Sequence, residues 1–185
     1  LAGWWPGRLW GGLLNAIVLG LGGQSHFSGL QLAREAGIRL EPVAYKGATP
    51  MVTDLVGGHV PAGISLMDDM LKFHRAGSVR VIGVFSQQRS PVAADIPTFV
   101  EQGYKDLFSE SWQGIWAPAR TPQAQIDRMQ DALKKVLEMP DVKQIMTTRL
   151  FVVPTFRPAV EMARLQDEEI RRWKPLIRGS GFKPE

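Results

Sequence analysis

Apolar and polar residues follow two different periods along this chain, and together they predict strands separated by helices. Residues 38–45, IRLEPVAY, alternate apolar and polar side chains, as strands with one buried face do. Residues 79–86, VRVIGVFS, form a nearly continuous apolar run, which predicts the clearest buried strand of the chain. The segments 59–66 and 109–119 have the same short, strand-like character.

Helical spacing of apolar residues marks the segments between and after these strands. The strongest case is the segment 121–138, where one face is expected to be buried because it carries Ile126, Met129, Leu133, Val136 and Leu137. Further helices are predicted at 25–36, 49–56 and 67–76, from residue 97, from residue 141 and within 157–181. Strands that alternate with helices predict an α/β fold with a largely parallel sheet.

Capping residues indicate where several of these helices begin and end. Ser25 and Thr121 stand at expected N-caps, and Gly37 at an expected C-cap. Thr49 followed by Pro50 has the order of a cap and a first-turn proline.

The first 21 residues differ in composition from the rest of the chain. They contain three of the six tryptophans and one charged residue, Arg8. The apolar run 9–21 is shorter than the roughly 20 residues that cross a bilayer. Two interpretations stay open, a leader segment that is damaged or truncated and a buried strand.

Composition and charge exclude some classes of function. The chain has 185 residues and no cysteine, which removes disulfides, thiolate nucleophiles and cysteine-bound metals. The formal net charge is +4, but the basic residues form no block or stripe, so a nucleic-acid partner is not expected. The same excess of positive charge suits small anionic solutes.

Signatures of catalysis and of cofactor binding are not found. Ser25 and His26 are adjacent, so on a helix their side chains diverge by about 100° and cannot form a nucleophile–base pair. His26, His59 and His74 are far apart and lack metal-ligand spacing. No phosphate-binding or dinucleotide motif is present. We therefore expect no enzyme activity, no cofactor and no metal site.

Six short motifs occur in an order that resembles a known family. They are YKGATPMVTDLVGGHV from Tyr45, then ISLMDD, AGSVRVIGVFSQQRSP, DIPTFVEQGY, SWQGIWAPARTP and the closing IRGSGFKPE. The chain from about Gly22 to Glu185 is thus similar to the Bug-type solute receptors, the periplasmic binding components of tripartite tricarboxylate transporters. The resemblance implies a two-lobed fold of the periplasmic binding protein type II, which closes on a small organic anion, usually a carboxylate.

The resemblance also implies a division of the chain. Residues 1–21 do not match the family segment expected there, 22–110 correspond to the ligand-binding second lobe, and 111–185 to the C-terminal part of the first lobe. The first lobe is incomplete, since the glycine-rich loop after its first strand is missing. Relative to the family, the chain is an N-terminally truncated receptor.

Two helix starts offer backbone N–H groups that could receive a carboxylate. They lie at Gly23, Ser25 and His26, and at Tyr45, Lys46, Gly47, Ala48 and Thr49. Asp68 marks a third turn, which would orient a loop or accept from a ligand hydroxyl or amine. Each of these residues also has an ordinary explanation, such as a cap, a packed side chain or a solvated lysine.

The expected function is therefore capture of a small carboxylate in the periplasm for the membrane subunits of a transporter. Two alternatives remain at this level. The same two-lobed fold serves as the effector-sensing domain of transcription regulators, although residues 1–21 cannot form a helix-turn-helix. The chain could also be a truncated receptor fragment without a binding function.

Overall fold

The computed structural model describes residues 14–109 and 111–183, which contain three strands and six helices. In chain order these are β1 (Leu14–Leu19), α1 (Gln24–Ala36), β2 (Leu40–Tyr45), α2 (Ala48–Val56), β3 (Ala62–Ile64), α3 (Met67–Arg75), α4 (Gln123–Glu138), α5 (Pro140–Thr148) and α6 (Ala159–Gly179). The chain divides into two compact units. Unit 1 comprises residues 1–110 and 176–185, and unit 2 comprises residues 111–175.

The sheet of unit 1 is parallel and has the order β2-β1-β3. Leu14 to Leu19 of β1 pair in register with Leu40 to Tyr45 of β2, and Ala16 to Val18 pair with Ala62 to Ile64 of β3. This confirms the α/β fold and the parallel sheet that the sequence predicts. It also settles residues 14–19 as a strand at the centre of the sheet, while residues 1–13 lie outside the described part of the chain.

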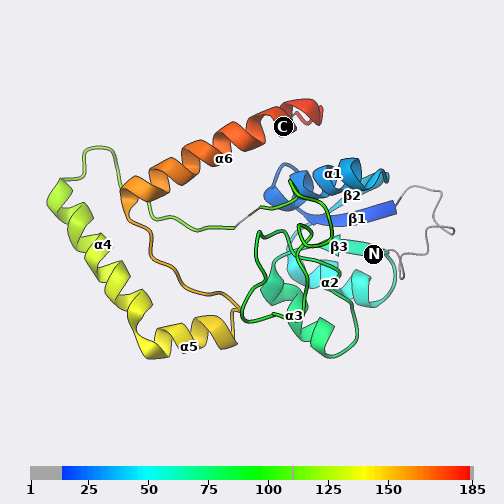
Figure 1. Cartoon of the computed structure of the whole chain (residues 1–185), viewed down its shortest axis with the longest axis horizontal. Coiled ribbons are helices and arrows are strands. Elements are labelled where there is room, and N and C mark those ends of the chain that lie inside the picture. Colours follow the sequence, from blue (N-terminus) through cyan, green and yellow to red (C-terminus); the bar gives the residue numbers. More distant parts are fainter. Residues whose placement is uncertain (1–13, 110, 184–185) are drawn as a thin grey trace. The chain divides into compact units, whose positions relative to one another are not determined.

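The helices cover both faces of this sheet because the strand order reverses at β1. The connection through α1 runs from β1 to β2, and the connection through α2 runs back past β1 to β3. Crossovers between parallel strands are right-handed, so opposite directions place the two helices on opposite faces. Figure 1 shows α1 on one face and α2 together with α3 on the other.

Two predicted strands, 79–86 and 109–119, are not strands in the structure. Val84 makes an isolated parallel bridge with Thr98, and its N–H donates to the carbonyl of Pro97 at 3.1 Å. Pro97, the residue before Thr98, has no N–H, so the next ladder bond on that side of the bridge cannot form. In the second segment Trp112 and Trp116 contact each other, with ring centroids 6.2 Å apart, but Trp116 is 68% exposed.

The short helix predicted from Pro97 is a single capped turn. The Thr98 N–H donates to Glu101 Oε2 at 2.8 Å, and the Glu101 N–H donates to Thr98 Oγ1 at 3.0 Å, which is a capping box. At the other end the Tyr104 N–H donates to Phe99 O and the Gly103 N–H to Val100 O, with Gly103 at φ +100°. This Schellman-type ending stops the helix after one turn.

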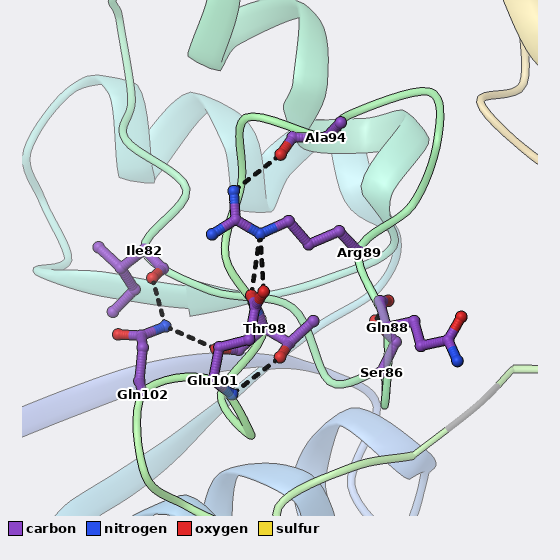
Figure 2. Close-up of polar contacts among 8 residues, drawn as sticks. All are labelled: Ile82, Ser86, Gln88, Arg89, Ala94, Thr98, Glu101 and Gln102. Carbon is purple, nitrogen blue, oxygen red and sulfur yellow. Dashed lines mark hydrogen bonds and ion pairs between the residues drawn. The ribbon is translucent and has the colours of Figure 1, made fainter.

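Arg89 ties the loop before this turn to the turn itself, as Figure 2 shows. Its Nε donates to both carboxylate oxygens of Glu101, at 3.0 and 2.9 Å, and its Nη1 donates to Ala94 O at 2.8 Å. The Thr98 N–H and the Arg89 guanidinium hold the pKa of Glu101 below its ordinary value, because both favour the charged carboxylate. Loop 86–104 is therefore ordered by polar contacts rather than by regular secondary structure.

The buried core of unit 1 draws side chains from α1, α2, α3 and the segment 93–107. Met51, Val52 and Met70 form a buried cluster, with Tyr45 and Phe73 among the residues packed around it. The other buried apolar residues of unit 1 are Phe27, Leu71, Ala93, Ile96, Phe99 and Leu107. Four of these come from 93–107, so a region without long elements supplies much of the core.

Unit 2 differs, because none of the described residues between 111 and 175 is buried. The expected buried face of α4 is therefore a wrong prediction: Met129 is 57% exposed and Val136 is 46% exposed. The helix itself forms as predicted, but its N-cap is Pro122 rather than Thr121. Unit 2 contains no strand among its described residues, so α4 has no sheet on which to bury its apolar side chains.

Across the described residues no helix combines the length and the hydropathy needed to cross a membrane.

Candidate functional site

Three loops meet at the carboxyl edge of the parallel sheet. Residues 20–23 follow β1, residues 46–47 follow β2, and residues 65–66 follow β3. Because the strands are parallel and in register, with Leu19 beside Tyr45 and Val18 beside Ile64, these loops are neighbours. In open α/β sheets ligands bind at this edge, where neighbouring strands send their helices to opposite faces. The topology therefore places all three predicted helix starts at one edge.

The three helices that begin there share an uncapped N-terminus. The N-cap residues are Gly23 for α1, Gly47 for α2 and Leu66 for α3, and none makes a side-chain cap hydrogen bond. Ser25 and Thr49 were predicted as caps, and this is wrong, since both lie inside the first turn of their helices. In α1 and α2 a glycine takes the N-cap position instead, and it has no side chain to cover the backbone at the start of the helix.

Gly47 has the most restricted backbone of the site. Its φ of +109° and ψ of 167° fall in a region that only glycine occupies readily. A Cβ at this position would meet no heavy atom within 4 Å. The glycine is therefore required by the backbone turn and not by crowding, and it leaves space in front of α2.

Tyr45 and Lys46, which precede Gly47, have different surroundings. The Tyr45 ring packs against the core cluster, and its hydroxyl donates to Asp54 Oδ2. This bond raises the pKa of Tyr45, because the neighbouring carboxylate opposes the phenolate. Lys46 is exposed and supplies a cation at the edge.

The third loop carries carboxylates and a hydroxyl. Asp68 Oδ1 accepts the N–H of Asp69, and the Ser65 hydroxyl donates to Asp69 Oδ2. Asp68 and Asp69 stand in the first turn of α3, where the helix dipole favours negative charge. This loop therefore suits a ligand group that donates, such as a hydroxyl, better than a second carboxylate.

His26 belongs to the predicted helix start at α1, and its side chain lies inside the unit. Only 6% of the residue is exposed, and its Nδ1 accepts the Gly22 N–H at 3.1 Å. Burial lowers its pKa below the ordinary value of 6.5, because the interior disfavours the charged ring. Ser25 beside it is half-buried, and Gly23 lies at the turn into α1.

Two residues near these helix starts were not predicted as site residues. Phe182 packs edge-on against His26 and Phe27, and Ser65 holds the start of α3 through Asp69. Phe182 is 156 positions from His26 along the chain, so no local pattern could connect them. Ser65 stands three residues before Asp68, and its place in the loop after a predicted strand was the only sequence feature that could have marked it as a site residue.

The arrangement brings together groups that can bind an anion. It offers uncapped helix N-termini, one exposed lysine and a hydroxyl, which together favour a small carboxylate. Within the described residues no group of three or more His, Asp or Glu side chains is placed to hold a metal ion.

Comparison with known proteins gives a family match. The model of the tripartite tricarboxylate transporter family receptor matches residues 10–182. The match thus starts at residue 10 rather than near Gly22, and it includes β1. A Pseudomonas sp. (strain P51) protein, the UPF0065 protein in the tcbD-tcbE intergenic region, is 32% identical over 90% of this chain. A Pseudomonas knackmussii protein, the UPF0065 protein in the clcB-clcD intergenic region, is 29% identical over 85% of it.

Solved structures support the same fold. R. palustris Rpa4515 with adipate has a TM-score of 0.81 and 26% identity, covering 93% of this chain and 57% of that one. MatC (Rpa3494) from Rhodopseudomonas palustris with bound malate has a TM-score of 0.73 and 29% identity, covering 89% and 56%. The chain therefore has the fold of the periplasmic binding proteins in this family, and its first lobe is incomplete compared with the first lobe of the solved structures. The chain spans 49% of the strain P51 relative and 94% of the P. knackmussii relative.

Proposed function

The chain belongs to the family of tripartite tricarboxylate transporter receptors, and on that premise we propose that it binds a small organic carboxylate at the carboxyl edge of its sheet. The single observation that carries the proposal is the convergence of three helix N-termini, none with a side-chain cap, at that edge. Each directs the positive end of a helix dipole toward this edge, although in the first turn of α3 the Asp69 N–H already donates to Asp68 Oδ1.

The proposed contacts divide between the loops. The N–H groups at the start of α2, the Thr49 hydroxyl and the Lys46 ammonium receive one carboxylate. The start of α1 around Gly23 and Ser25 lies next to it along the edge. Asp68 and Ser65 face the part of the ligand that can donate a hydrogen bond. The bound adipate and malate of the two R. palustris proteins support dicarboxylates and hydroxy acids as the ligand class.

We further propose that the ligand is captured in the periplasm and passed to membrane subunits of a transporter. The family match supports this partnership. The assignment of 22–110 to the ligand-binding lobe and of 111–185 to the other lobe is part of the same proposal. No covalent chemistry is involved, so the chain would act as a receptor and not as an enzyme.

A thermal-shift scan of the 185-residue chain against mono-, di- and tricarboxylates and amino acids tests the proposal. A ligand present at 100 times its Kd stabilises the folded state by about 2.7 kcal/mol, which is roughly 5–10 °C in the melting midpoint of a protein of this size. We expect such a rise with a dicarboxylate such as malate or adipate and none with an amino acid. A cooperative melt that no carboxylate shifts would contradict binding by this chain.

Replacing Thr49 with valine should weaken carboxylate binding about tenfold, because a hydrogen bond to a charged group is lost without a change in side-chain size. Isothermal titration with the carboxylate found in the scan measures the effect. Thr53→Val is the matched control: Thr53 lies one turn later on α2, is exposed, and donates to Thr49 O. Equal affinity in the two variants would remove Thr49 from the proposed site.

A further inference from the structure

The His26 side chain sits where the loop after β1 turns into α1, and aromatic rings enclose it. It stacks on Phe27, with ring centroids 5.1 Å apart and planes at 30°. Phe182 meets it edge-on, at 5.6 Å and 75°, and also meets Phe27 at 5.7 Å and 86°. The imidazole is thus held between rings from two distant parts of the chain, and only 6% of the residue is exposed.

The hydrogen bond of this ring fixes its protonation state. The Gly22 N–H donates to His26 Nδ1, so Nδ1 carries no proton and the neutral ring has its proton on Nε2. A protonated ring would have N–H groups at both positions. Nδ1 could then no longer accept, and two donors would face each other in a buried place.

Gly22 is constrained from the opposite side as well. Its φ is +79°, and a Cβ there would lie 2.7 Å from the Phe182 ring. The loop residue next to the N-cap of α1 is therefore held by an imidazole acceptor and by an aromatic ring. Both contacts act on the backbone that determines where the first N–H groups of α1 point.

We propose that His26 is a positioning residue: its neutral Nδ1 fixes the loop between β1 and α1 for carboxylate binding, and protonation of the ring releases that loop. The link to ligand binding rests on the proposed function. The part that concerns the loop alone does not.

The charged groups near this ring are few. Loop 20–23 has no titratable side chain. The C-terminal segment that packs on the ring carries Arg178 and Lys183, α1 itself carries Arg34 and Glu35, and α1 is joined to Asp106 through a hydrogen bond from Gln31. Burial alone lowers the pKa of His26, with no ion pair as a cause. The neutral ring is therefore favoured in the folded state, and its contribution is complete above pH 6.5 and is lost as the pH falls through the lower folded-state pKa.

Two substitutions separate a positioning role from simple packing. In His26→Asn the side-chain oxygen can replace Nδ1 as the acceptor and does not titrate. In His26→Leu the side chain has a similar size but no acceptor. In both variants the Gly22 amide is followed by hydrogen exchange, as a protection factor, between pH 7.5 and 5.5. Malate and adipate affinities are measured by calorimetry over the same range.

In the unaltered chain we expect protection of the Gly22 amide and carboxylate affinity to fall together toward pH 5.5. His26→Asn should keep both at every pH, and His26→Leu should lose protection and bind roughly tenfold more weakly at pH 7.5, since a buried donor loses its partner. His59→Gln, at an exposed histidine, should behave like the unaltered chain. The ligand's own titration affects all variants alike.

The outcomes are distinct for the two proposals. If no carboxylate binds to the unaltered chain, the proposed function fails and the Gly22 amide alone decides the loop mechanism. If His26→Asn keeps the pH dependence of the unaltered chain, or if His26→Leu protects Gly22 equally well, the inference is overturned even when ligand binding is intact. Should His26→Leu fail to fold, the loss of pH dependence in His26→Asn carries the test.

Discussion

Replacing Met51 with alanine is expected to lower the free energy of unfolding by about 2–5 kcal/mol, because the side chain is fully buried and its loss leaves a cavity. Met51 is 0% exposed, and together with Val52 of α2 and Met70 of α3 it forms the buried cluster. For a protein of this size the change corresponds to a fall of roughly 4–20 °C in the melting midpoint. Urea unfolding followed by far-UV circular dichroism measures it.

Met129→Ala is the matched control, since it removes the same atoms from a helix at a position that is 57% exposed. Exposed substitutions usually change the free energy of unfolding by less than about 0.5 kcal/mol. The structure thus predicts a large difference between two identical changes. If the two substitutions lowered the free energy of unfolding equally, the apolar face of α4 would be buried in solution, as its sequence pattern predicts, and not exposed as in the structure.

Replacing Gly47 with alanine should cost about 1–3 kcal/mol of stability, because its backbone lies in a region that residues with a Cβ avoid. No neighbouring atom opposes the added methyl group, so the whole effect comes from the backbone. Relief of this strain would change the turn before α2 and turn its first N–H groups away from the ligand. We therefore expect carboxylate affinity to fall together with stability, with both measured on the same preparation.

Gly179→Ala provides the comparison for this change. Gly179 ends α6, and a Cβ there also meets nothing within 4 Å, but its φ is not positive. Alanine is the better helix former by about 1 kcal/mol at most, so stability should stay the same or rise slightly. If Gly47→Ala is tolerated as well as Gly179→Ala, the turn before α2 is not strained and its proposed role loses its basis.

The helices of this protein could be predicted from the sequence, because their hydrogen bonds and their apolar spacing are local. The segments 25–36, 49–56, 67–76 and 121–138 all form helices close to these bounds. The exact starts were less accurate. Ser25 and Thr49 have the side chains of good caps, but glycines take those positions, since the loops require extended backbone or a positive φ there.

Strands and buried faces depended on partners that are distant along the chain. The apolar run 79–86 is more strand-like than β3, yet β3 pairs with β1, and the run makes only an isolated bridge with Thr98, next to Pro97, which lacks an N–H. The apolar spacing in 121–138 correctly predicted the helix α4. It wrongly predicted that the apolar face is buried, because burial also requires a second surface on which the face can pack. A strand and a core each require a partner, and a pattern in one segment does not identify it.

By itself, then, the sequence determined the α/β class, most of the helices and the family, through periodicity and the order of short motifs. It also predicted the glycine-rich helix starts as candidate anion sites. Only the tertiary structure decided that these starts meet at one edge, with β1 between β2 and β3, and that His26 turns inward to hold Gly22 beneath Phe182. The physical reason is that strand order and aromatic packing join residues far apart in the chain, which local spacing cannot specify.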